Sequence, residues 1–112
     1  GINIATAQDT ICDGFHIFGT GDPLDYGLLC SYVAQYNTPQ RIKIIFDMIT
    51  KNPAKILRIT KNYGIKVGKK ADLNIIAANN IQEAFRLRAD RRYVIKDGKV
   101  IVENSSKTEF KI

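Results

Sequence analysis

The chain has 112 residues, 45% hydrophobic and 25% charged, which is the balance of a single soluble domain. No apolar run approaches the roughly 20 residues that a membrane-spanning helix needs, so we expect a cytoplasmic protein with no membrane partner. Cys12 and Cys30 form neither a CxxC pair nor a disulfide framework, and two free thiols are expected.

The net charge of +6 is unevenly distributed. Residues 1–50 carry two basic and five acidic side chains, and residues 51–112 carry fifteen basic and six acidic ones. A basic half permits a nucleic-acid-binding module, and Ala54 to Ile65 has spacing near that of a helix-turn-helix. Gly68 interrupts the would-be recognition helix, and most Lys and Arg are scattered singly. We therefore expect a solvated basic surface with no nucleic-acid partner.

The first element predicted is a strand over residues 2–8, where Ile2, Ile4 and Thr6 alternate with small uncharged residues. The absence of charge indicates a strand covered on both faces. A loop over residues 8–22 with three glycines and no helical period follows. Loops of this length in compact domains are usually functional.

Three helix starts follow in order. Asp22-Pro23, Thr38-Pro39 and Asn52-Pro53 each join a capping side chain to a proline that needs no hydrogen-bond partner in the first turn. The first helix has an apolar stripe, the second should run to about Thr50, and the third should end at Gly64. The predicted stripe of the first helix consists of Leu24, Leu28, Leu29, Tyr32, Val33 and Tyr36.

The pattern then changes to strands. Residues 72–76 alternate, Asn80 can cap a short helix near 80–88, and Asp97-Gly98 lies between two apolar runs, which is a strong hairpin signal. Three or four strands make a small sheet, and the strand at 2–8 has no partner nearby in sequence. We expect missing neighbours, supplied by the rest of a longer chain or by self-association.

Asp9 is the residue best placed for chemistry, because it follows a predicted buried strand and begins a long loop. An Asp there also commonly hydrogen-bonds its own turn, and Asp13 before Gly14 is first a turn former. His16 is the only histidine and is interpreted as a loop residue that does not bind metal, since a zinc site needs three or four ligands. The sequence contains no complete active site.

Several segments together resemble one family. Thr50 to Ile76, with Tyr-Gly-Ile-Lys-Val-Gly-Lys-Lys-Ala-Asp-Leu, resembles the C-terminal signature of the amidohydrolase superfamily, and Tyr93 to Val100 resembles its closing hairpin. Residues 7–22 and 85–88 are most similar to bacterial cytosine deaminases.

The resemblance implies an α/β parent, a metal-dependent (β/α)8 barrel with a small β-sandwich. This chain would be its C-terminal α+β fragment, with one barrel strand, about three helices and a β-hairpin. Residues 1–64 would supply the last barrel strand and the following helices. Residues 65–112 would supply strands of the β-sandwich and the short helix.

The resemblance also implies site roles. Asp9 takes the position of the catalytic carboxylate that binds a divalent metal, iron or zinc, and handles protons of the attacking water. Thr10 stands where a second Asp is usual, and Phe15 where a Trp is usual; both are candidate substrate-binding residues. The other metal ligands lie on earlier strands, so no metal and no activity are expected for this chain alone.

The implied reaction of the parent is hydrolytic deamination of cytosine, a small-molecule substrate, to uracil and ammonia. Hydrolysis of a cyclic amide or imide by a member of the same superfamily is the nearest alternative.

Overall fold

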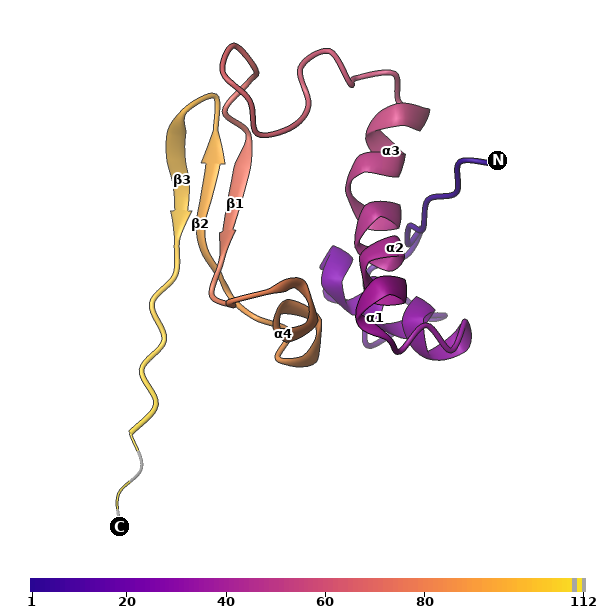
Figure 1. The fold of residues 1–112 in the computed structure, drawn as a ribbon. Coiled ribbons are helices and arrows are strands. Elements are labelled where there is room, and N and C mark those ends of the chain that lie inside the picture. Colours follow the sequence, from indigo (N-terminus) through magenta and orange to yellow (C-terminus); the bar gives the residue numbers. More distant parts are fainter. Residues whose placement is uncertain (110, 112) are drawn as a thin grey trace.

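Helices dominate the first half of the chain and strands the second. The computed structural model describes residues 1–109 and 111 (Figure 1). No helix in this part of the chain is long and apolar enough to cross a membrane. In chain order the elements are α1 (Pro23–Val33), α2 (Pro39–Ile49), α3 (Lys51–Ile56), β1 (Leu73–Ile76), α4 (Ile81–Arg86), β2 (Arg91–Lys96) and β3 (Lys99–Glu103).

Side-chain caps fix the starts of three helices at predicted positions, whereas the predicted start at Asn52-Pro53 is wrong, because α3 begins at Lys51 without a side-chain cap. The Asp22 carboxylate accepts a hydrogen bond from the backbone N–H of Leu24 at 2.7 Å. Thr38 caps α2 in the same way, and Asn80 caps α4 by accepting from the N–H of Glu83 at 2.9 Å. Each cap satisfies a backbone donor that the first helical turn leaves free.

The predicted strand over residues 2–8 is wrong for the described chain, because this segment forms no strand. A strand needs a neighbour, and this segment instead makes its hydrogen bonds with the α2 and α3 region. The Ile4 carbonyl accepts from the Asn52 side-chain amide at 2.7 Å, and the Thr6 N–H donates to the Met48 carbonyl at 3.1 Å. Ile2 is 91% exposed, so the predicted burial on both faces is absent.

The third helix ends earlier than predicted. It stops at Ile56, whereas the glycine signal placed its end at Gly64. Arg58 adopts a positive φ of 57°, and the N–H of Ile59 turns back to the Ala54 carbonyl at 3.0 Å. A non-glycine residue in the left-handed conformation gives no sequence signal of a helix stop.

The three strands form one antiparallel sheet in the order β1-β2-β3. The hairpin between β2 and β3 turns at Asp97 and Gly98, whose φ values of 47° and 77° are those of the predicted Asp-Gly turn. The Asp72 carboxylate accepts from the Asp97 N–H at 2.8 Å and pairs with Lys96. The Asp97 N–H and then the Lys96 charge hold the pKa of Asp72 below its usual value.

The core lies where α4 meets α1 and α2. Its fully buried side chains are Phe85, Leu24 and Ile45, and Phe46 packs edge-on against the Phe85 ring with centroids 6.3 Å apart. Figure 1 shows α4 at one end of the sheet, next to the α1 and α2 region. Because α4 comes from the predicted 65–112 segment, that segment completes the helical core; the division near residue 64 stays a prediction.

The predicted apolar stripe of α1 does not enter a single core. Leu24 is buried and Leu28 packs on the buried cluster, as predicted. Leu29, Tyr32 and Val33 are exposed, which corrects the prediction for these three residues. Helix α1 lies between two cavities and carries apolar side chains towards both. The periodicity of the sequence shows which positions are apolar but not what covers them.

A partly buried ion pair joins the two halves of the chain. Both oxygens of the Asp22 carboxylate accept hydrogen bonds from the Arg91 guanidinium, which stands at the start of β2. The two side chains are only 24% and 20% exposed. Asp22 therefore caps α1 and holds the sheet at the same time.

Gly27 should be required for close packing of α1. A Cβ added there would lie 2.8 Å from Cε1 of buried Phe85 and 3.3 Å from Cγ2 of Ile49. Overpacking costs roughly 1–3 kcal/mol and better helix propensity returns about 1 kcal/mol, so Gly27→Ala should lower the free energy of unfolding by about 1 kcal/mol. Urea denaturation measures the change. Gly14→Ala, with no atom within 4 Å, is the control, and equal stability of both variants would contradict the prediction.

Two substitutions of Asp22 should separate its role as the cap of α1 from its role as the partner of Arg91. Asp22→Asn keeps a good cap but loses the charge that pairs with Arg91, whereas Asp22→Ala loses both, a further cost of about 1 kcal/mol. Stability should fall from wild type to Asn to Ala in thermal or urea unfolding. Thr38→Ala, which removes a cap but no ion pair, is the matched control. An Asp22→Asn variant as stable as wild type would disprove the role of the ion pair.

Candidate active-site cavity

A cavity of about 820 Å³ lies where the N-terminal segment meets α1. Its walls come from residues 6–10, from the 15–20 part of the following loop, from one side of α1 and from Arg88. The three residues that the sequence singles out, Asp9, Thr10 and Phe15, all line this cavity. The structure thus brings them together, while their chemical roles stay predictions.

The three candidate residues differ in exposure. Asp9 is exposed and has no ion-pair partner within the described residues, so its carboxylate is free to take a ligand. Thr10 is half-buried. Phe15 is 95% exposed, and its ring at the cavity wall is open to a planar partner.

Asp13 shapes the part of the loop that carries Phe15. One of its carboxylate oxygens accepts hydrogen bonds from the backbone N–H groups of Phe15 and His16, each at 2.9 Å. The His16 N–H, and then the Phe15 N–H, hold the pKa of Asp13 below its usual value. The prediction that Asp13 forms a turn is confirmed. His16 also lines the cavity.

The far end of the loop is tied to α1 and to the end of α4. The Thr20 hydroxyl donates to the Asp25 carboxylate, whose other oxygen lies 3.5 Å from Nε of Arg88. All three residues line the cavity. The sequence analysis did not identify Asp25 or Arg88 as site residues, because they lie far apart in the chain and neither has a local motif.

The side of α1 that faces the cavity is largely apolar. Tyr26, Leu29, Cys30 and Val33 are spaced so that they share this side of the helix. Burial, and then the negative charge of Asp22, raise the pKa of Tyr26 above its usual value, so its phenol stays neutral. A small planar molecule with few charges fits such a wall better than a polyanion does.

A divalent metal would find only part of a coordination shell here. Asp9 offers the hard oxygen ligand that such ions accept. Within residues 1–109 and 111, however, no three His, Cys, Asp or Glu side chains gather closely enough to hold an ion. Among the described residues, Asp9 could therefore supply no more than one ligand of a metal site.

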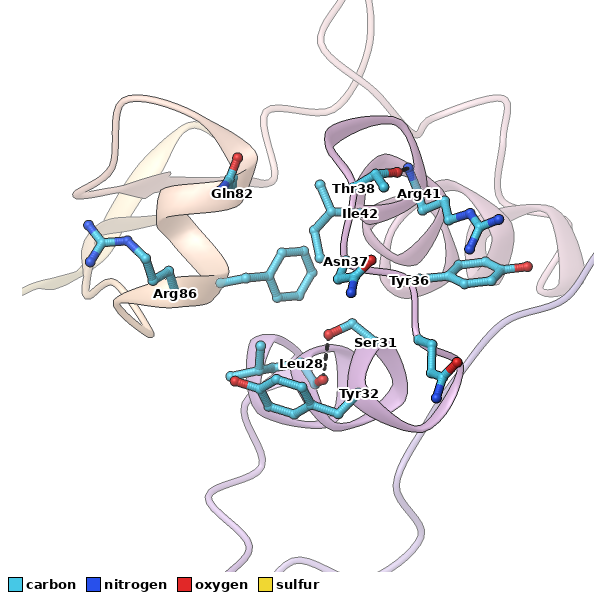
Figure 2. A pocket seen from close by; sticks show the side chains of 12 residues that line it. Leu28, Ser31, Tyr32, Tyr36, Asn37, Thr38, Arg41, Ile42, Gln82 and Arg86 are labelled. Carbon is cyan, nitrogen blue, oxygen red and sulfur yellow. Dashed lines mark hydrogen bonds between the residues drawn. The ribbon is translucent and has the colours of Figure 1, made fainter.

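A second cavity, of about 700 Å³, lies on the opposite side of α1, towards α2 and α4. Phe85 and Asn37 line it, and the buried Ser31 hydroxyl donates to the Leu28 carbonyl at 2.7 Å (Figure 2). Arg41 stacks on the Tyr36 ring, 5.4 Å from its centroid. None of the candidate site residues Asp9, Thr10 and Phe15 lines this cavity.

Some basic side chains of the second half make ion pairs. Arg88 and Arg91 pair with Asp25 and Asp22, and Lys70 pairs with Asp97. Residues 66–70 form a turn that leads towards β1, so the recognition helix of a helix-turn-helix is not formed there. The absence of a nucleic-acid partner stays a prediction.

The curated and solved relatives are enzymes that act on carbon–nitrogen bonds. The chain is 40% identical over 104 residues to the N-isopropylammelide isopropyl amidohydrolase of Pseudomonas sp. (strain ADP), covering 93% of this chain. It superposes on 5-methylcytosine deaminase from Klebsiella pneumoniae liganded with 5-fluorocytosine with a TM-score of 0.90 and 30% identity over 98% of this chain. The same values hold for the structure liganded with phosphonocytosine.

The chain spans only about a quarter of these relatives, 26% of the amidohydrolase and 27% of the deaminase. Residues 1–102 match the model of the amidohydrolase family, which confirms the resemblance seen in the sequence. Metal dependence is general in that family. On this match and these relatives, the chain belongs to the amidohydrolase family.

Proposed function

We propose that this chain is the C-terminal part of a metal-dependent amidohydrolase that deaminates cytosine or a related cyclic amidine. The observation that carries the proposal is the shared cavity of Asp9, Thr10 and Phe15 in a chain of this family. The likeness to a deaminase liganded with 5-fluorocytosine supports a pyrimidine as the substrate class.

Asp9 is the proposed catalytic residue. Hydrolysis forms a bond between the ring carbon and the water oxygen and breaks the bond to the exocyclic nitrogen, which leaves as ammonia. The Asp9 carboxylate takes a proton from the attacking water and returns one to the departing nitrogen. Its exposure on the cavity and its lack of an ion pair among the described residues leave it free for both steps.

Thr10 and Phe15 are the proposed substrate-binding residues. The Thr10 hydroxyl can donate or accept one hydrogen bond at the edge of the base. The Phe15 ring can stack on the face of the base, and the Asp13 turn sets its position. The two residues thus contact different parts of a planar heterocycle: Thr10 its edge and Phe15 its face.

A divalent metal, iron or zinc, would lower the pKa of the attacking water when bound. Asp9 supplies one ligand from this chain. The remaining ligands belong to the rest of the full-length protein, so this chain alone should be inactive.

Hydrolysis of a cyclic amide or imide is the second candidate. It is favoured by the 40% identity to an amidohydrolase named for its action on N-isopropylammelide. The two candidates differ in their products, because deamination of cytosine releases ammonia, whereas hydrolysis of a cyclic amide or imide bond opens the ring. Product analysis on the full-length protein therefore distinguishes them.

Replacing Asp9 by Asn in the full-length protein should abolish turnover, because the amide cannot take the proton from water. A loss of about 10²-fold or more in kcat is expected for a general base. Ammonia release from cytosine measures turnover, and elemental analysis measures the bound metal, which should also fall. Asp90→Asn, the same change at an exposed position outside the cavity, is the control. Turnover retained by Asp9→Asn would refute the assignment.

Replacing Phe15 by Ala should weaken substrate binding, because the stacking surface is lost. Aromatic pairs contribute about 0.5–1.5 kcal/mol, so KM should rise roughly threefold to tenfold with a smaller change in kcat. Steady-state kinetics measure both constants. Phe15→Tyr keeps the ring and should retain the wild-type KM; an Ala variant with an unchanged KM would exclude stacking by this residue.

A further inference from the structure

We propose that Arg88 is a positioning residue that holds the loop of residues 10–21 at the Asp9 cavity, acting through Asp25 and Thr20. The inference deepens the proposed function. Its kinetic test depends on that function, and its hydrogen-exchange test does not. It concerns a residue at the end of α4, far in sequence from Asp9.

An uninterrupted series of contacts connects Arg88 with the end of the loop. Nε of Arg88 lies 3.5 Å from one oxygen of the Asp25 carboxylate, and the other oxygen accepts from the Thr20 hydroxyl. The Thr20 hydroxyl oxygen in turn accepts from the Asp22 N–H at 3.2 Å. The end of the loop is thus held to the first turn of α1 through groups that meet at Asp25.

The charge balance explains why Arg88 matters to this contact. Asp22 and Asp25 are both acidic and stand close together at the start of α1. Asp22 is compensated by Arg91, and Arg88 is the cation that compensates Asp25. Without Arg88, Asp25 would keep only the helix N-terminus as a positive partner. Water would then compete more effectively for the hydrogen bond between the Asp25 carboxylate and the Thr20 hydroxyl.

The backbone of Arg88 lies in the left-handed region. Arg88 stands two residues beyond the last residue of α4 with a positive φ of 46°, and the Ala89 N–H turns back to the Ala84 carbonyl at 3.0 Å. Glycine is favoured at this position of a helix end, and a residue with a Cβ is strained there. This backbone geometry does not by itself assign a role to the side chain, so the role of Arg88 rests on its contact with Asp25.

Arg58 provides a matched comparison. It follows α3 with a φ of 57°, and the Ile59 N–H turns back to the Ala54 carbonyl at the same 3.0 Å. The backbone geometry is therefore nearly that of Arg88. Arg58, however, lines neither cavity and makes no ion pair within the described residues.

The first experiment compares Arg88→Gly with Arg58→Gly in the full-length protein. Both changes relieve the same backbone strain, so neither should lower the melting temperature. Amide hydrogen exchange followed by mass spectrometry should become about fivefold faster in peptides covering residues 10–21 for Arg88→Gly only, in line with an exposed ion pair. Arg88→Lys should restore most of the protection. Unchanged exchange in Arg88→Gly would overturn the proposal.

The second experiment tests whether Arg88 acts through Asp25. With cytosine as substrate, Arg88→Gly and Asp25→Asn should each raise KM by about fivefold, and the double variant should show no further rise. Additive effects would mean that Arg88 acts independently of Asp25 and would overturn the proposal. The exchange experiment needs no substrate. A wild-type protein that releases no ammonia would therefore refute the proposed function while leaving the role of Arg88 to be decided by exchange.

Discussion

The pairing of Asp22 with Arg91 is the interaction on which the rest of the structure depends. It joins the first residue of the helical region to the first residue of β2, across a separation of 69 residues. The same carboxylate caps α1, so one side chain sets the start of the helix, the position of the sheet and the end of the loop of residues 10–21. A partly buried charge pair with further hydrogen bonds is costly to break, because either partner left alone would be desolvated without compensation.

Helix α1, which Asp22 caps, separates the two cavities and contributes side chains to both. On the buried side of α1, Gly27 has no side chain. The Phe85 ring of α4 fills the space that a side chain there would need. The other side of α1 faces the Asp9 cavity with Tyr26 and apolar neighbours. Close packing on one side therefore fixes the position of the other side, and a shift of the helix on Phe85 would be transmitted directly to the cavity wall.

Sequence patterns predicted what depends on local chemistry. The starts at Asp22, Thr38 and Asn80 and the Asp97-Gly98 turn rest on hydrogen bonds or φ angles within a few residues, and all were correct. The resemblance to amidohydrolases added the family and the candidates Asp9, Thr10 and Phe15. The structure shows that these three share a cavity, which spacing alone could not establish.

Apart from the bounds of α3, whose early end has a local cause at Arg58, the errors arise from dependence on distant parts of the chain. A strand over residues 2–8 needs a partner to pair with, and the described residues provide none. Leu29 and Val33 are apolar because they face a cavity. The contact of Arg88 with Asp25 arises from tertiary folding, which no local pattern encodes.

The position of α4 has a consequence for how this part of the protein can be exchanged between relatives. Ala84 and Phe85 belong to the helical core, although they lie between β1 and β2 in the chain. The sheet is thus not a separable module, since its crossover segment is part of the packing of its neighbour. A chimera that takes the sheet from another amidohydrolase must carry matching residues at α4, at Gly27 and at Ile49, or it will join two surfaces that do not interlock.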